Sequence, residues 1–187
     1  MYGSQARQLK RHGVDSTYGS IETWAKENAW PPSMSVVDRD HAVRLVLSEV
    51  VPSEQQLLLV YTTPKLLRHM VYAQNLRNGG VICADATYKV CKTGHCVYMI
   101  GTVDVGQRYH TIGVAIATKE NTCNFVKVFK ALKEAAENEF GIEVKPKYGM
   151  SNACSSIANA GEEAFPGIEW LTCYSHIKVS PLSYLVR

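Results

Sequence analysis

Three consecutive runs of strand-forming residues constrain the fold of this chain more than any other feature of its sequence. The runs cover residues 81–90, 95–103 and 108–118. Short stretches at 92–94 and 104–107 separate them and are rich in the residue types that form turns. The sequence therefore predicts an antiparallel meander of three strands.

Asp85 is a lone carboxylate midway along the first of these runs, which is otherwise apolar. Burying a charge is costly unless something pairs with it, and a bound metal ion is a common partner. Asp85 is therefore a candidate metal ligand. The alternative is that it makes a structural hydrogen bond within the sheet.

The residues beyond the meander predict a helix, a strand, a second helix and a last strand. The first helix covers about 122–140, where one apolar stripe recurs with helical spacing and Gly141 follows. Residues 147–151 are short enough for a strand, 153–164 fit a helix, and 168–173 form the last strand.

The part of the chain before residue 79 is expected to be a separate, mostly helical segment, 1–78, which precedes a second part at 79–187. Apolar residues from Asp40 onward recur with helical spacing as far as Pro52. A short strand at 57–62 follows, and Thr63 and Pro64 then resemble a cap and first position of another helix.

Composition is that of an ordinary globular protein and gives little support for a broad basic surface. The 187 residues carry a net charge of +3, and 46% of them are hydrophobic. No apolar run approaches the ~18 residues of a membrane span, and no secretory signal is visible. The six cysteines lack zinc-ribbon spacing, so we expect reduced thiols in an intracellular, non-secreted protein.

Four short sequences, in order and with suitable spacing, resemble those of Mutator-like element (MULE) transposases. The first is 79–89, which contains Asp85, and the second is Thr-Lys-Glu-Asn-Thr at 118–122. The third is Ala-Phe-Pro at 164–166, and the fourth is Cys-Tyr-Ser-His at 173–176. The resemblance covers about residues 57–187.

The resemblance implies an α/β fold of the ribonuclease-H-like kind. It would have a mixed sheet, with the antiparallel three-strand meander plus parallel strands, flanked by helices and incomplete at the C-terminus. The implied activity is that of a DDE enzyme, in which three acids hold two Mg²⁺ or Mn²⁺ ions for DNA strand cleavage and transfer. DNA would be the partner, with no membrane, and the nucleus the location. A homo-oligomer is kept open as the assembly state.

The acids that this chemistry requires are incomplete in the chain. Asp85 matches the first acid, but the position of the second is occupied by Asn152, which brings no charge. The third acid should lie well downstream of the Cys-x-x-His, and the chain ends at Arg187 before such a position. Glu120 could be an auxiliary ligand or a solvated loop glutamate. We therefore expect weak metal binding and a catalytically inactive protein.

The remaining candidate residues each have two interpretations. Cys173 and His176 could supply half of a zinc site or a thiol pair, and the resemblance implies a structural or substrate-proximal pair. Lys89 and Lys92 could contact DNA phosphates or be ordinary exposed lysines.

The sequence as a whole predicts a partial, inactive MULE-type transposase core. A first alternative is a non-enzymatic DNA-binding or protein-interaction module derived from a transposase. A second is an unrelated α/β binding domain.

Overall fold

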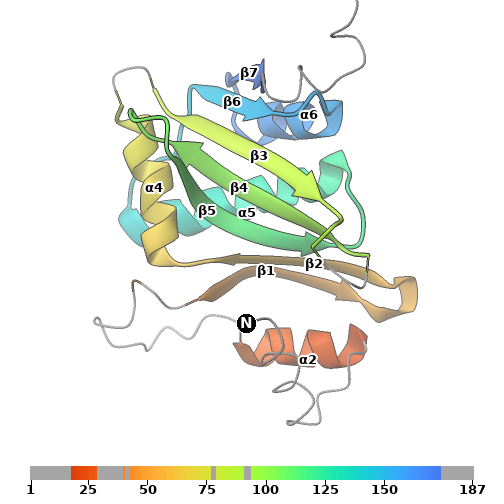
Figure 1. The fold of residues 1–187 in the computed structure, drawn as a ribbon. Coiled ribbons are helices and arrows are strands. Elements are labelled where there is room, and N and C mark those ends of the chain that lie inside the picture. The colour runs from red at the N-terminus through yellow and green to blue at the C-terminus, as the bar shows by residue number, and fades with distance from the viewer. Residues whose placement is uncertain (1–17, 29–39, 41–42, 77–78, 91–93, 174–187) are drawn as a thin grey trace, which may run out of the picture.

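A seven-stranded sheet forms the centre of the computed structural model, which describes residues 18–28, 40, 43–76, 79–90 and 94–173 (Figure 1). The strand order is β1-β2-β5-β4-β3-β6-β7. Within the described residues the elements are α2 (Tyr18–Asn28), β1 (Arg44–Val51), η1 (Pro52–Glu54), β2 (Gln56–Thr62), α4 (Pro64–Gln74), β3 (Val81–Thr87), β4 (Cys96–Val103), β5 (Tyr109–Ala117), α5 (Thr122–Phe140), β6 (Tyr148–Ser151), α6 (Ser155–Ala164) and β7 (Glu169–Thr172).

The predicted meander and the parallel strands beside it are confirmed. β3 pairs antiparallel with β4, and β4 pairs antiparallel with β5. β6 lies beside β3 and is parallel to it, and β7 is parallel to β6. The turn between β4 and β5 closes where the Gln107 N–H donates to the Asp104 carbonyl. The strand that carries Asp85 is therefore an interior strand of a mixed sheet.

The helix predicted from Asp40 to Pro52 is wrong, because residues 44–51 of this segment form strand β1. β1 pairs with β2 through a β-bulge between Leu45 and Leu47. A bulge adds one residue to a strand, so the apolar positions shift and imitate helical spacing. The four valines at 43–51 also favour a strand, because β-branched side chains fit a pleated sheet. Two strands of the sheet thus come from the segment expected to be mostly helical.

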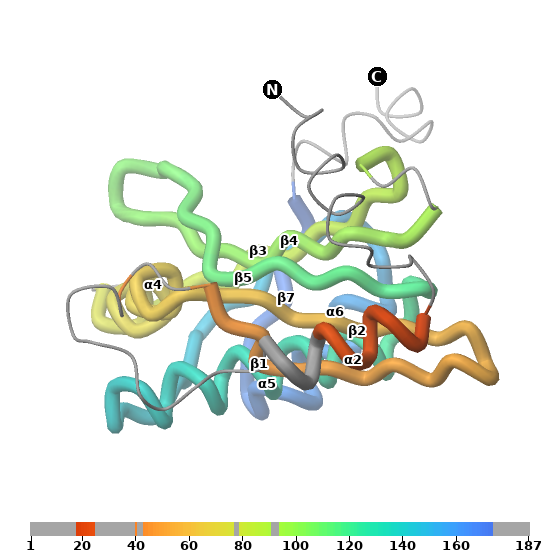
Figure 2. Tube along the Cα trace, turned by 90° about the horizontal axis from the view of Figure 1, so that it is seen from below, coloured from red at the N-terminus to blue at the C-terminus, as the bar shows by residue number. Residues whose placement is uncertain are grey.

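Helices α4, α5 and α6 cover one face of the sheet and enclose the main core (Figures 1 and 2). α5 begins and ends where the sequence predicts. The Asn121 side chain accepts a hydrogen bond from the Asn124 N–H at 2.8 Å, and Gly141 ends the helix with a φ of 65°. The predicted cap of α4 is also confirmed, since the Thr63 hydroxyl accepts from the Leu66 N–H.

Among the described residues, the helix on the opposite face of the sheet is α2, which packs over β1, β2 and part of β5. Tyr18 and Ile21 of α2 pack on a second, smaller apolar cluster that includes Leu57 and Leu59 of β2. We call the remainder of this face, over β3, β4 and the start of β5, the open face. It is the face on which Asp85 lies.

Candidate functional site

Asp85 is exposed on the open face, so the expectation that its charge is buried is wrong. Ile82 and Ala84 of β3 point into the core between sheet and helices. Because side chains alternate along a strand, Cys83 and Asp85 point to the opposite side. The Asp85 carboxylate accepts a hydrogen bond from the Ala86 N–H at 2.9 Å. Because the Asp85 side chain is exposed, its charge is solvated by water and needs no buried partner.

Three residues that the sequence analysis selected lie in one row across the carboxyl ends of the parallel strands. Cys83 pairs in register with Met150, and Met150 pairs with Leu171. Two positions further along the chain from these three residues are Asp85, within β3, and Asn152 and Cys173, just past the last residues of β6 and β7. The parallel pairing of β3, β6 and β7 thus directs the three residues toward the same edge of the sheet. The Cys173 N–H continues the ladder by donating to the Ser151 carbonyl at 2.7 Å.

The Asn152 side chain takes part in starting α6. Its amide oxygen accepts a hydrogen bond from the Cys154 N–H at 3.0 Å. This is the Asx-type turn that often precedes a helix. Beside it, the indole N–H of Trp170 donates to the Ser151 hydroxyl at 3.0 Å. The oxygen that would face a metal ion is therefore already engaged with backbone.

Glu120 lies in the loop before α5, where it is half-buried and contacts the residue that precedes α6. The Cys154 thiol lies 3.7 Å from the Glu120 carboxylate and donates to it. The pKa of the Cys96 thiol is raised to about 11, chiefly by burial and then by the charge of Glu120, with Asp85 adding a smaller effect. Both carboxylates are therefore close enough to Cys96 for their charges to affect its pKa, a proximity that the sequence analysis did not predict.

The Cys83 thiol, two residues before Asp85 on β3, is held in its protonated form at neutral pH. Burial raises the pKa of the Cys83 thiol to about 11, and the negative form of Cys173 adds to the shift. Since the reactive form of cysteine is the thiolate, Cys83 is inert in this environment. The effect of Cys173 on this pKa indicates that the two cysteines lie near each other.

The predicted basic residues are only partly covered by the structure. Lys89 is exposed just beyond β3, and its N–H lies 3.4 Å from the Thr87 hydroxyl. Lys92 and His176 lie outside the described residues, so the predicted Cys-x-x-His pair is described at Cys173 alone.

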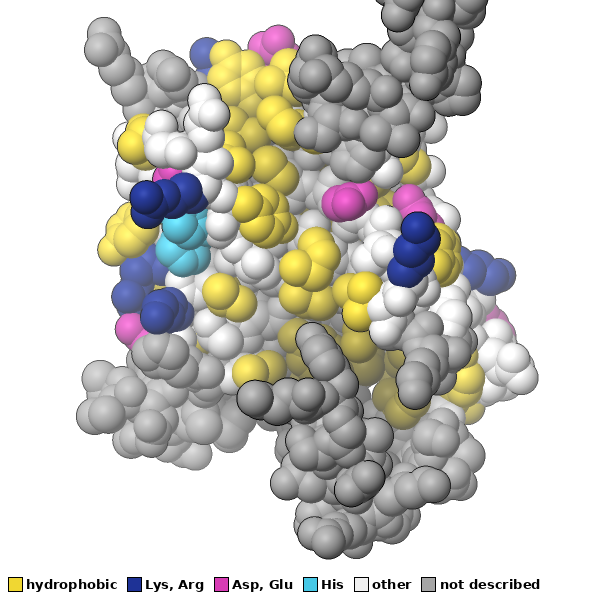
Figure 3. All heavy atoms as spheres, in the orientation of Figure 1, with side chains coloured by type: hydrophobic (Ala, Val, Ile, Leu, Met, Phe, Trp, Pro, Cys, Tyr) yellow, Lys and Arg dark blue, Asp and Glu magenta, His cyan; other side chains and the backbone are white. Residues whose placement is uncertain are grey.

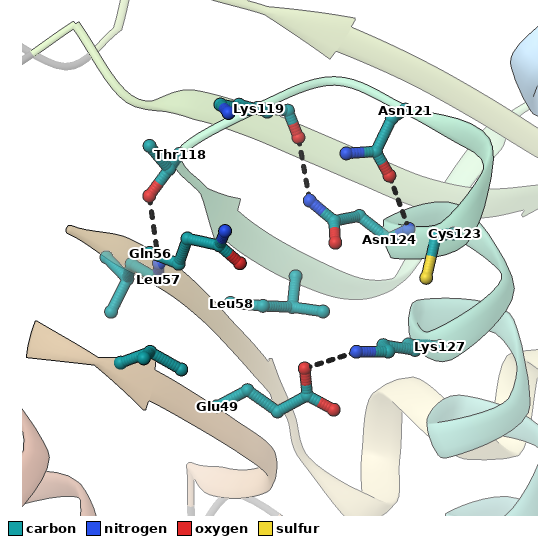
Figure 4. Close-up of a pocket in the computed structure, with 11 residues that line it drawn as sticks. Glu49, Gln56, Leu57, Leu58, Thr118, Lys119, Asn121, Cys123, Asn124 and Lys127 are labelled. Atoms are coloured by element: carbon teal, nitrogen blue, oxygen red, sulfur yellow. Dashed lines mark hydrogen bonds and ion pairs between the residues drawn. The ribbon is translucent and has the colours of Figure 1, made fainter. Parts of the chain in front are cut away.

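A pocket of about 220 Å³ lies elsewhere, between β2 and the start of α5 (Figure 4). Its wall contains the ion pair between Lys127 and Glu49. No member of the row of Asp85, Asn152 and Cys173 lines it. The carboxylate already present beside Lys127 makes this pocket a poor site for an anion.

The meander, the parallel strands and the helices between them define a ribonuclease-H-like α/β domain. A family model of the MULE transposase domain matches residues 81–180, which are more than half of the 187. The chain belongs to this family, and the whole row falls within the match. No curated protein matches the chain significantly. Among the described residues, no helix has the length and apolar character needed to cross a membrane.

The divalent metal ions that the family implies do not fit the residues around Asp85. Two metal ions held close together need several anionic oxygens to offset their charge. Of the row, only Asp85 is a carboxylate, and the Asn152 oxygen is engaged with the Cys154 N–H. Within the described residues, no group of three histidine, cysteine or acidic side chains could hold a metal ion.

Proposed function

We propose that this transposase-derived chain binds DNA without cleaving it. The observation that carries the proposal is Asn152, at the position that should supply the second acid. An amide brings no charge, and here its oxygen accepts from the Cys154 N–H. Asp85 alone would hold Mg²⁺ weakly, because an ion with one carboxylate ligand keeps most of its water.

Glu120 does not complete the metal site in this proposal. Its carboxylate accepts from the Cys154 thiol, which lies next to the helix that Asn152 starts. Moving it toward Asp85 would break that contact and bring two negative charges together, which raises the cost of ionising both.

DNA binding is supported by family membership, since transposase domains generally bind DNA. The chain's net charge of +3 is modest, so we expect weak affinity that falls as salt rises, because few phosphate contacts release few counterions.

Nicking of supercoiled plasmid DNA tests the catalytic half of the proposal. With Mg²⁺ or Mn²⁺, the unaltered protein should nick no faster than Asp85→Asn, a variant of equal size without the charge. Metal-dependent nicking that Asp85→Asn abolishes would show that the chain has kept its chemistry.

Fluorescence anisotropy with labelled DNA in EDTA tests the binding half. We expect measurable binding at low salt, with the logarithm of the affinity falling linearly with the logarithm of the salt concentration. No binding even at low salt would reject the DNA-binding proposal and leave the protein-interaction alternative.

A further inference from the structure

A β-bulge in β5 changes which of its side chains point toward the helices and which point toward the open face. In its pairing with β4, Gly113 and Thr111 lie opposite consecutive residues, so Ile112 is the extra residue. Ile112 is fully buried in the core between sheet and helices, as is Ala117 further along. Strict alternation from Ala117 would point Tyr109 at the helices. The bulge turns it to the open face, which is a common use of bulges near functional sites.

The Tyr109 ring lies over Gly101 of β4. A Cβ placed on Gly101 would overlap the ring, so the ring rests on the only residue type that leaves room for it. Gly101 pairs in register with Cys83, two residues before Asp85. Burial raises the pKa of the Tyr109 hydroxyl to about 12, and the charges of Cys83 and Asp85 add to the shift. One face of the ring is thus supported by the sheet.

Tyr109 also remains accessible to solvent, with 48% of the residue exposed. Figure 3 shows apolar side chains gathered over the middle of this face, with basic side chains at its left and right margins. Arg108, next to Tyr109, and Lys89, beyond the end of β3, are both exposed. A supported aromatic ring between cations matches the needs of a nucleic acid strand, whose bases stack and whose phosphates are negative.

We propose that Tyr109 is a stacking platform for one base of a single DNA strand that crosses the open face past Asp85. This inference rests on the proposed DNA binding and adds the face and the residue that perform it. Stacking on an aromatic ring is tolerant of sequence, because every base has a flat face. The platform therefore contributes affinity without selecting a base.

The test compares two fluorescein-labelled strands of equal length, oligothymidine and a strand without bases, by anisotropy in EDTA. Tyr109→Thr, which keeps a strand-forming residue, should weaken binding of oligothymidine about tenfold, while Tyr109→Phe stays within about twofold. The control Tyr72→Thr, at a tyrosine of α4 that is 61% exposed, should have no effect. All variants should bind the baseless strand equally.

Gly101→Ala provides a second variant that leaves Tyr109 in place. Its added Cβ should displace the ring and weaken binding of oligothymidine to a similar degree. If Tyr109→Thr does not fold, the affinity of Gly101→Ala for oligothymidine tests the platform in its place. If these variants bind oligothymidine as tightly as the unaltered protein does, the platform is wrong although DNA binding stands. If the unaltered protein binds neither strand, the proposed function fails and the platform with it.

Discussion

Asn152 performs a structural task at the single-residue scale that an aspartate would perform equally well. Either side chain can accept the Cys154 N–H at the start of α6. The fold therefore gives no reason for the amide, and the difference between the two residues is one negative charge beside Asp85. That charge is what a divalent metal ion would require.

Asn152→Asp should therefore strengthen Mn²⁺ binding, measured by titration calorimetry, by restoring a carboxylate about 5 Å from Asp85. In the metal-free variant, one carboxyl of the pair should titrate with a raised pKa, because neighbouring carboxylates resist joint ionisation. The matched control is Asn159→Asp, which adds the same charge at an exposed position of α6. An equal gain in both variants, or none in either, would show that position 152 is outside the site.

At the scale of elements, the packing of α6 on β6 and β7 depends on the Trp170 indole. A Cβ on Gly149 of β6 or on Gly161 of α6 would overlap the ring. Gly161→Ala should gain about 1 kcal/mol of helix propensity but lose about 1–3 kcal/mol to overpacking, so we expect net destabilisation. Guanidinium unfolding followed by circular dichroism measures it. Adding Trp170→Leu should remove the penalty, and a Gly161→Ala variant more stable than the parent would contradict the packing.

How far the sequence predicts these elements depends on whether their signals are local. The bounds of α5 could be predicted closely, because its apolar stripe lies within the helix and Gly141 directly follows its last residue. The helix predicted over 40–50 failed because a bulge in β1 broke the alternation. The position of Asp85 in a strand could be predicted, but its exposure could not, because that depends on which face the helices cover. The direction of the Tyr109 side chain toward the open face could not be predicted either, because it depends on a bulge that is visible only in the pairing of β5 with β4.

At the scale of the whole molecule, the sheet is larger than the family-matched region, which begins at Val81. Strands β1 and β2 precede Val81 in the sequence and belong to the same sheet. Arg44 of β1 also forms an ion pair with Glu139 of α5 at 2.8 Å, with side chains only 7% and 12% exposed. Removing one partner of a buried pair typically costs about 3–5 kcal/mol, because the other charge stays behind. The sheet and this ion pair join residues 44–62 to the helices that support the site.

We therefore expect the described part of the chain to unfold as one cooperative unit. Trp24 of α2 lies 6.3 Å from Tyr61 of β2 between ring centroids, and Trp170 lies 6.3 Å from Phe129 of α5. Single-tryptophan variants, with the other tryptophans changed to phenylalanine, allow fluorescence to follow each end of the sheet separately. Their guanidinium midpoints should coincide, because β2 and β5 join the two ends through continuous pairing.

Arg44→Met should lower both midpoints together, because the buried Glu139 charge loses its ion pair with Arg44 in the shared core. The matched control is Lys130→Met, which breaks an ion pair with Glu163 whose side chains are more than half exposed and which should cost little. A Trp24 transition at distinctly lower denaturant than that of Trp170, with only the former shifted by Arg44→Met, would instead mean that β1 and β2 unfold apart from the family-matched region.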